Sequence, residues 1–140
     1  MKYKYVKDLT SDVMFEAYGK DLKEVFENAA HAMFETICHD VEPKDKREVT
    51  VKSDSVEELL FAWLQELIAM VDIEEMFFSK FEILSIENNE LKANVYGETT
   101  APEKGETVVK AVTNYGYKFE KTNEGYKVTV SLDIWCCQSL

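Results

Sequence analysis

The residues with the clearest chemical potential are carboxylates in a short polar segment near the start of the chain. Asp8 and Asp12 are four residues apart, with the hydroxyls of Thr10 and Ser11 between them. The alternating segment 12–18 predicts a strand, with Asp12 at its start. A carboxylate on a rigid strand suits cation binding, because its backbone is fixed before the ion arrives. Aspartates in solvated turns, with neighbouring hydroxyls bonded to the local backbone, are also common, and the spacing alone favours this second interpretation.

A third carboxylate, Asp133, lies near the C-terminus in the segment Ser131-Leu132-Asp133-Ile134. The segment continues a strand-like alternation, and aspartate is depleted in strands. A functional role would account for its presence there. Asp133 also shares the polar side of the alternation with Ser131, so an outward-facing solvated residue remains the alternative.

Motifs typical of enzymes are absent from the sequence. It has no glycine-rich phosphate loop, no HExxH, no EF-hand spacing and no nucleophile elbow. His31 and His39 are the only histidines, and neither lies beside an obvious nucleophile, so we expect no catalytic triad. We expect His31 to project into solvent from the polar face of its helix. Cys136 and Cys137 are a candidate soft-metal or redox pair, but no further Cys or His lies nearby.

Composition narrows the class of protein and its partners. The 140 residues carry a net charge of −11 and are 46% hydrophobic, which fits one domain over 1–140 with a substantial core. The acidic surplus argues against direct binding of nucleic acid and suits a basic partner protein. No apolar run approaches the roughly 20 residues of a membrane span. With three cysteines and a polar start, we expect a cytoplasmic protein. We also expect it to be a monomer.

Two amphipathic helices are predicted from apolar residues at helical spacing. The first covers 22–37 and begins after Asp21, which forms a capping box with Glu24. The second begins after Ser55, which has Glu58 three residues later, and ends between 72 and 75.

The remaining periodicity predicts strands and hairpins. The strands are expected at 3–7, 12–18, 48–52, 77–87, 91–97, 108–114, 117–120 and 126–134. Asn88-Asn89 and 122–125 are hairpin turns, 41–46 and 99–106 are loops, and Gly116 interrupts a strand. We therefore predict an α+β fold, with the two helices packed on a mostly antiparallel sheet in a single domain.

Several segments, in order, resemble the archease family. They are Asp8-Leu9-Thr10-Ser11-Asp12-Val13, residues 26–35, Phe78-Ser79-Lys80-Phe81, Val109-Lys110-Ala111-Val112-Thr113 and Leu132-Asp133-Ile134. The match covers nearly the whole chain to Ile134, and residues 135–140 form a C-terminal extension beyond it.

The resemblance implies a non-enzymatic activator of the tRNA-splicing RNA ligase, one that promotes guanylylation of the ligase and its multiple turnover in tRNA splicing. It also implies a divalent cation, calcium with magnesium or manganese as alternatives. The implied ligands are Asp12, Asp133 and the backbone oxygen of Ile134. Asp8 and Lys110 are candidates for contact with the partner, although Lys110 is equally compatible with an ordinary solvated strand lysine.

The chain departs from the family pattern where Leu9, Gly105 and Tyr115 stand in place of usual histidines. A metal site formed by aspartates is more compatible with these three residues than any role that requires histidine. Two alternatives remain open. One is a chaperone or specificity factor for a tRNA-modifying methyltransferase, and the other is a metal-dependent hydrolase using Asp8, Asp12 and Asp133.

Overall fold

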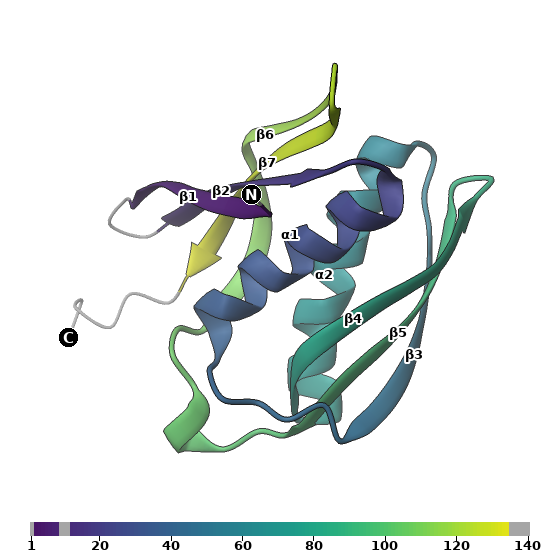
Figure 1. The fold of residues 1–140 in the computed structure, drawn as a ribbon. Coiled ribbons are helices and arrows are strands. Elements are labelled where there is room, and N and C mark those ends of the chain that lie inside the picture. Colours follow the sequence, from purple (N-terminus) through teal and green to yellow (C-terminus); the bar gives the residue numbers. More distant parts are fainter. Residues whose placement is uncertain (1, 9–11, 135–140) are drawn as a thin grey trace.

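The computed structural model describes residues 2–8 and 12–134, with the backbone alone at Lys7, Asp8 and Asp12. Within these ranges two α-helices lie between two sheets (Figure 1). Every strand pairing is antiparallel. The predicted α+β fold is therefore confirmed, and the structure adds that the strands divide into two separate sheets.

The first sheet carries the candidate site. Its strand order is β1-β2-β7-β6, formed by β1 (Tyr3–Asp8), β2 (Asp12–Gly19), β7 (Gly125–Ile134) and β6 (Val109–Thr122). The second sheet has the order β3-β5-β4, formed by β3 (Asp45–Lys52), β5 (Glu90–Thr99) and β4 (Met76–Glu87). Because β7 lies between β2 and β6, the last strand runs beside the N-terminal segment.

The helices begin where the capping residues predict. Asp21 accepts a hydrogen bond from the Glu24 backbone N–H at 2.9 Å and starts α1 (Leu22–Ile37). Ser55 accepts from the Glu58 N–H at 3.1 Å and starts α2 (Val56–Glu74). Neither helix has the length and apolar character needed to cross a membrane.

The core fills the space between the sheets and around both helices. Trp63 of α2 is fully buried, and its indole N–H donates to the carbonyl of Phe26 on α1 at 3.0 Å. This bond satisfies the single polar group of the largest buried side chain, so Trp63 can pack in the core without an unpaired donor.

Three local predictions are wrong. β6 is not interrupted at Gly116. It continues through a bulge, with a register shift between Thr113 and Lys118, and Gly116 takes a φ of 66° that favours glycine. β3 begins at Asp45, inside the segment predicted as a loop, because its first residues already pair with β5.

His31 is the third correction, because it is partly buried rather than fully solvated. Its ring packs edge-to-face on Phe81 of β4, with centroids 5.0 Å apart. Burial, with a smaller contribution from the charge of Lys2, lowers the pKa of His31. The side chain therefore belongs to the aromatic contact between α1 and β4, which the helical periodicity alone did not reveal.

Candidate functional site

The fold brings together two aspartates from opposite ends of the chain. β2 and β7 pair with Asp12 directly opposite Asp133. Residues directly opposite one another in an antiparallel pair have Cβ atoms about 4.5–5.5 Å apart. The backbone register thus places the two predicted metal ligands at neighbouring positions.

Lys110 lies beside this pair on the next strand. β6 is bulged between Val109 and Ala111, with Ala111 opposite Asp133, and a bulge redirects the side chain that it contains. The Lys110 ammonium lies 3.7 Å from a carboxylate oxygen of Asp133, and both side chains are partly exposed. Such a solvated pair stabilises a fold by only about 0–1 kcal/mol, so its main effect is on the local charge around Asp133.

The other predicted site residues occupy different positions. Asp8 ends β1 opposite Val13 rather than Asp12. Ile134 ends β7 opposite Val109, and its side chain packs against the core, which leaves its backbone oxygen as the candidate ligand. Leu9, Thr10, Ser11, Cys136 and Cys137 lie outside the described residues.

Two of the positions where the family usually has histidine lie apart from one another. Gly105 forms an isolated bridge with Cys38, at the C-terminal end of α1. Tyr115 lies in the β6 bulge and is 65% exposed.

Burial, with a smaller contribution from Glu106, raises the pKa of the Cys38 thiol to about 12, which makes this cysteine chemically inert.

Ser131 is a residue of interest that sequence reasoning missed. The alternation predicted a solvent-facing residue, but Ser131 is fully buried, between its cross-strand neighbours Met14 and Thr113. Its hydroxyl has no hydrogen-bond partner among the described residues. Leaving a buried hydroxyl unpaired costs about 1–3 kcal/mol. Because residues two apart on a strand share a face, this hydroxyl lies on the same face of β7 as Asp133.

These donors fit a hard cation. Carboxylate, carbonyl and hydroxyl oxygens suit calcium, magnesium and manganese rather than zinc. In the part of the chain that the structure describes, no three His, Cys, Asp or Glu side chains form a metal-binding group. Calcium binds about 6–8 oxygen atoms, so two carboxylates would leave many of its coordination positions to water or to a partner. The arrangement therefore suits weak binding that a second macromolecule can complete.

A charged cluster lies along the same strands, around Glu16 of β2. Its carboxylate accepts from the Tyr18 hydroxyl at 2.6 Å and lies 3.4 Å from Lys127 and 3.6 Å from Lys4. The Tyr18 hydrogen bond, then the two lysines, lower the pKa of Glu16. Burial and the bond to Glu16 raise the pKa of Tyr18 to about 12.

We expect this cluster to stabilise the protein at neutral pH but not in acid. A carboxyl whose folded pKa is depressed contributes stability above its unfolded pKa, and that contribution disappears as pH falls through the folded pKa. Glu16→Gln should therefore be less stable than the parent protein at pH 7, with the difference shrinking from about pH 5 to about pH 3. Urea unfolding across this range measures it. Tyr18→Phe should remove much of the same pH dependence. A difference in stability between Glu16→Gln and the parent protein that stays constant from pH 7 to about pH 3 would contradict the assignment.

Comparison with known proteins gives one consistent result. The model of the archease protein family (MTH1598/TM1083) matches residues 3–134. Protein archease of Methanosarcina acetivorans is 43% identical over 141 residues, covering 95% of this chain and 96% of that protein. Protein archease of Sulfurisphaera tokodaii is 42% identical over 130 residues, covering 89% and 94%.

Solved structures agree with the fold. The solution structure of Methanobacterium thermoautotrophicum protein 1598 superposes with a TM-score of 0.80 at 34% identity, covering 94% of this chain and 97% of that one. A Thermotoga maritima crystal structure, described as an archease and possible chaperone, has a TM-score of 0.67 at 22% identity, covering 93% and 96%. The second likeness bears on the fold alone.

Proposed function

Because the chain belongs to the archease family, we propose that it is a non-enzymatic activator of the tRNA-splicing RNA ligase. It promotes guanylylation of the ligase and allows repeated turnover. The observation that carries this proposal is the β2–β7 register, with Asp12 opposite Asp133 and Lys110 at 3.7 Å from Asp133. The side chains of Lys110 and Asp133 are partly exposed, as those of a contact surface for a second protein must be.

A divalent cation forms part of the proposed contact surface. Asp12, Asp133 and the Ile134 carbonyl would hold calcium, or magnesium or manganese by the same oxygen chemistry. When bound, the ion supplies positive charge and open coordination positions at the surface. The chain's own residues hold that charge beside Lys110, so two cationic centres face the same partner. Negatively charged groups of the ligase or of its nucleotide suit such a surface.

The overall charge supports a protein partner rather than RNA. With a net charge of −11, the molecule as a whole repels the phosphate backbone that dominates nucleic-acid affinity. We therefore propose that it acts on the ligase in the cytoplasm without binding tRNA directly.

A guanylylation assay tests the proposal. The purified ligase is given GTP with and without this protein, and both the covalent transfer of GMP to the ligase and the number of joins per ligase are measured. We expect the protein to increase both quantities. If neither quantity changes at saturating protein, the proposed function is wrong.

We expect Lys110→Ala to separate metal binding from partner contact. Removing a cation 3.7 Å from Asp133 should raise calcium affinity by about two- to fivefold, the range of an exposed ion pair. Stimulation of the ligase should fall, because a charged contact with the partner is lost. Calorimetric titration and the guanylylation assay measure the two effects.

The matched control is Lys118→Ala, on the same strand, where the lysine lies 3.6 Å from Glu120. It should change neither calcium affinity nor stimulation. If Lys110→Ala leaves stimulation at the level of this control, Lys110 is an ordinary surface residue.

A further inference from the structure

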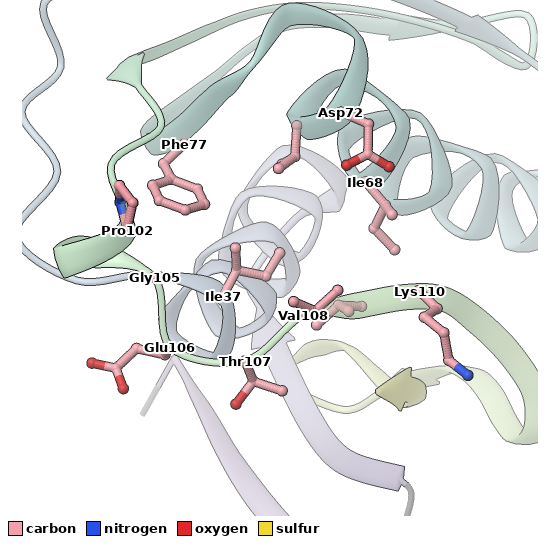
Figure 2. A pocket seen from close by; sticks show the side chains of 12 residues that line it. Ile37, Ile68, Asp72, Phe77, Pro102, Gly105, Glu106, Thr107, Val108 and Lys110 are labelled. Carbon is pink, nitrogen blue, oxygen red and sulfur yellow. The ribbon is translucent and has the colours of Figure 1, made fainter. Parts of the chain in front are cut away.

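A partly apolar groove of about 510 Å³ lies where the ends of both helices meet the segment before β6 (Figure 2). Its apolar walls come from every layer of the fold: Ile37, Ile68, Val71, Phe77, Val108 and Val109. The volume lies within the range of roughly 300–1,000 Å³ typical of binding pockets. Its size and partly apolar lining make it a candidate docking surface.

Val108 is the exposed apolar residue of this groove. It is 65% exposed, whereas the adjacent Val109 is buried. Val108 immediately precedes β6, which is an edge strand of the first sheet. An exposed apolar side chain gains free energy when a partner removes it from water, at about 25 cal/mol per Å² of apolar surface. A partner that reaches this edge strand can therefore cover it.

The charges around the groove indicate the charge of a segment that could bind there. Asp72 of α2 lies on its rim (Figure 2), on a chain whose net charge is −11. Glu106 also lines the groove, but its carboxylate is directed away from the cavity (Figure 2) and lies 2.5 Å from His39. An apolar side chain flanked by lysine or arginine complements both the walls and the rim, whereas an acidic segment would be repelled.

The groove is continuous with the proposed contact surface through Lys110. This residue lines the groove, but its ammonium is directed away from the cavity (Figure 2) and lies 3.7 Å from Asp133. The edge of β6 therefore carries the groove on one side and the Asp133 cluster on the other. A partner bound at that edge can contact both.

We propose that the groove holds an apolar side chain from a basic segment of the partner ligase. This inference rests on the proposed function and adds the position and the chemistry of the docking segment. Binding of the segment around β6 brings the ligase to the Asp12 and Asp133 positions.

Lysine substitutions at two exposed apolar positions test the proposal. Val108→Lys removes the apolar contact and repels a basic segment. It should raise the concentration of protein needed for half-maximal stimulation of ligase guanylylation by about tenfold or more, as expected for a central anchor. Leu84→Lys is the matched control, since Leu84 is 49% exposed on β4 and does not line the groove. It should shift that concentration less than about twofold.

A second pair of variants tests the charge. Asp72→Asn should raise the half-maximal concentration by about two- to fivefold at low salt, and the difference should shrink as salt increases. Glu87→Gln removes the same charge at an exposed position of β4 and should have no such effect. Thermal melts of all four variants establish that each is folded.

The outcomes separate this inference from the proposed function. If the parent protein fails to stimulate the ligase, the proposed function is wrong, and the docking inference is wrong with it. If the parent protein stimulates and Asp133→Asn does not, but Val108→Lys matches Leu84→Lys, only the docking inference is wrong.

Stimulation by Val108→Lys at lower concentration than the parent protein would show that a segment of this chain covers the groove. A dimer that Val108→Lys dissociates, with stimulation unchanged, would assign the groove to a second copy. Both results overturn the proposal.

Discussion

Replacing Asp133 with asparagine should abolish most of the stabilisation that calcium confers on this protein, together with most of its stimulation of the ligase. Asp133 is one of the two aspartates whose backbone positions lie opposite one another in the β2–β7 register. An ion that binds only the folded state stabilises it by about 2.7 kcal/mol at 100 times its dissociation constant. For a chain of this size that corresponds to a rise of about 10 °C in melting temperature. Asn retains the shape but loses the charge that holds the ion.

Thermal melts with and without calcium, paired with the guanylylation assay, measure both losses. Asp12→Asn should behave in the same way, because one carboxylate leaves too little charge for the ion. Asp45→Asn is the control, since Asp45 is exposed at the start of β3 in the other sheet, and its calcium response should equal that of the parent protein.

Two results would contradict the metal assignment. The first is a full calcium shift in both Asp12→Asn and Asp133→Asn, which would show that these residues do not share one site. The second is zinc binding that is tighter than calcium binding and requires Cys136 and Cys137, which would indicate a sulfur site rather than an oxygen site.

Gly97→Ala should cause the largest loss of stability of any variant considered. Gly97 of β5 lies between β3 and β4, and a Cβ atom there would lie 1.8 Å from the carbonyl oxygen of Phe77. The obstacle is backbone, so no rotation of a side chain relieves it and the sheet itself must move. We expect a loss of about 3 kcal/mol or more, or about 10 °C in melting temperature.

Gly105→Ala is the matched control for that variant. Its Cβ would lie 3.5 Å from the nearest atom, the tip of the Phe77 ring, and Gly105 has a φ of −79° that alanine readily adopts. Its stability should remain within about 1 kcal/mol of the parent protein. Equal melting temperatures for the two variants would show that β5 can shift away from β4 without cost.

Local features of the fold were predictable because they depend on neighbours in the sequence. The helix starts at Asp21 and Ser55 follow from side-chain oxygens that reach N–H groups three residues later, which is an interaction within one turn. The apolar stripes of both helices and the alternation of the strands are local in the same way. The bulge at Gly116 was misread because glycine is common both in turns that end a strand and in bulges that continue it.

The candidate site depended on more than the pattern of the residues. Periodicity alone left Asp8, Asp12 and Asp133 as solvated residues or ligands, and resemblance to a family suggested which of them to join. The sequence by itself determined the oxygen chemistry of the donors, the acidic charge and the strands that carry them. It did not determine which residues lie opposite one another, because a strand can pair in many registers with either edge of its neighbours.

Only the tertiary structure decided the remaining features. The position of β7 between β2 and β6 sets Asp12 opposite Asp133, and Lys110, at a bulge of β6, lies 3.7 Å from Asp133. Packing from other elements buries Ser131 fully and His31 in part, although the alternation and the helical period had placed both in solvent. The groove beside Val108 combines both helices, β4 and the segment before β6. Contacts between segments so far apart in the chain are selected by the global packing of the core, and no local pattern of residues encodes them.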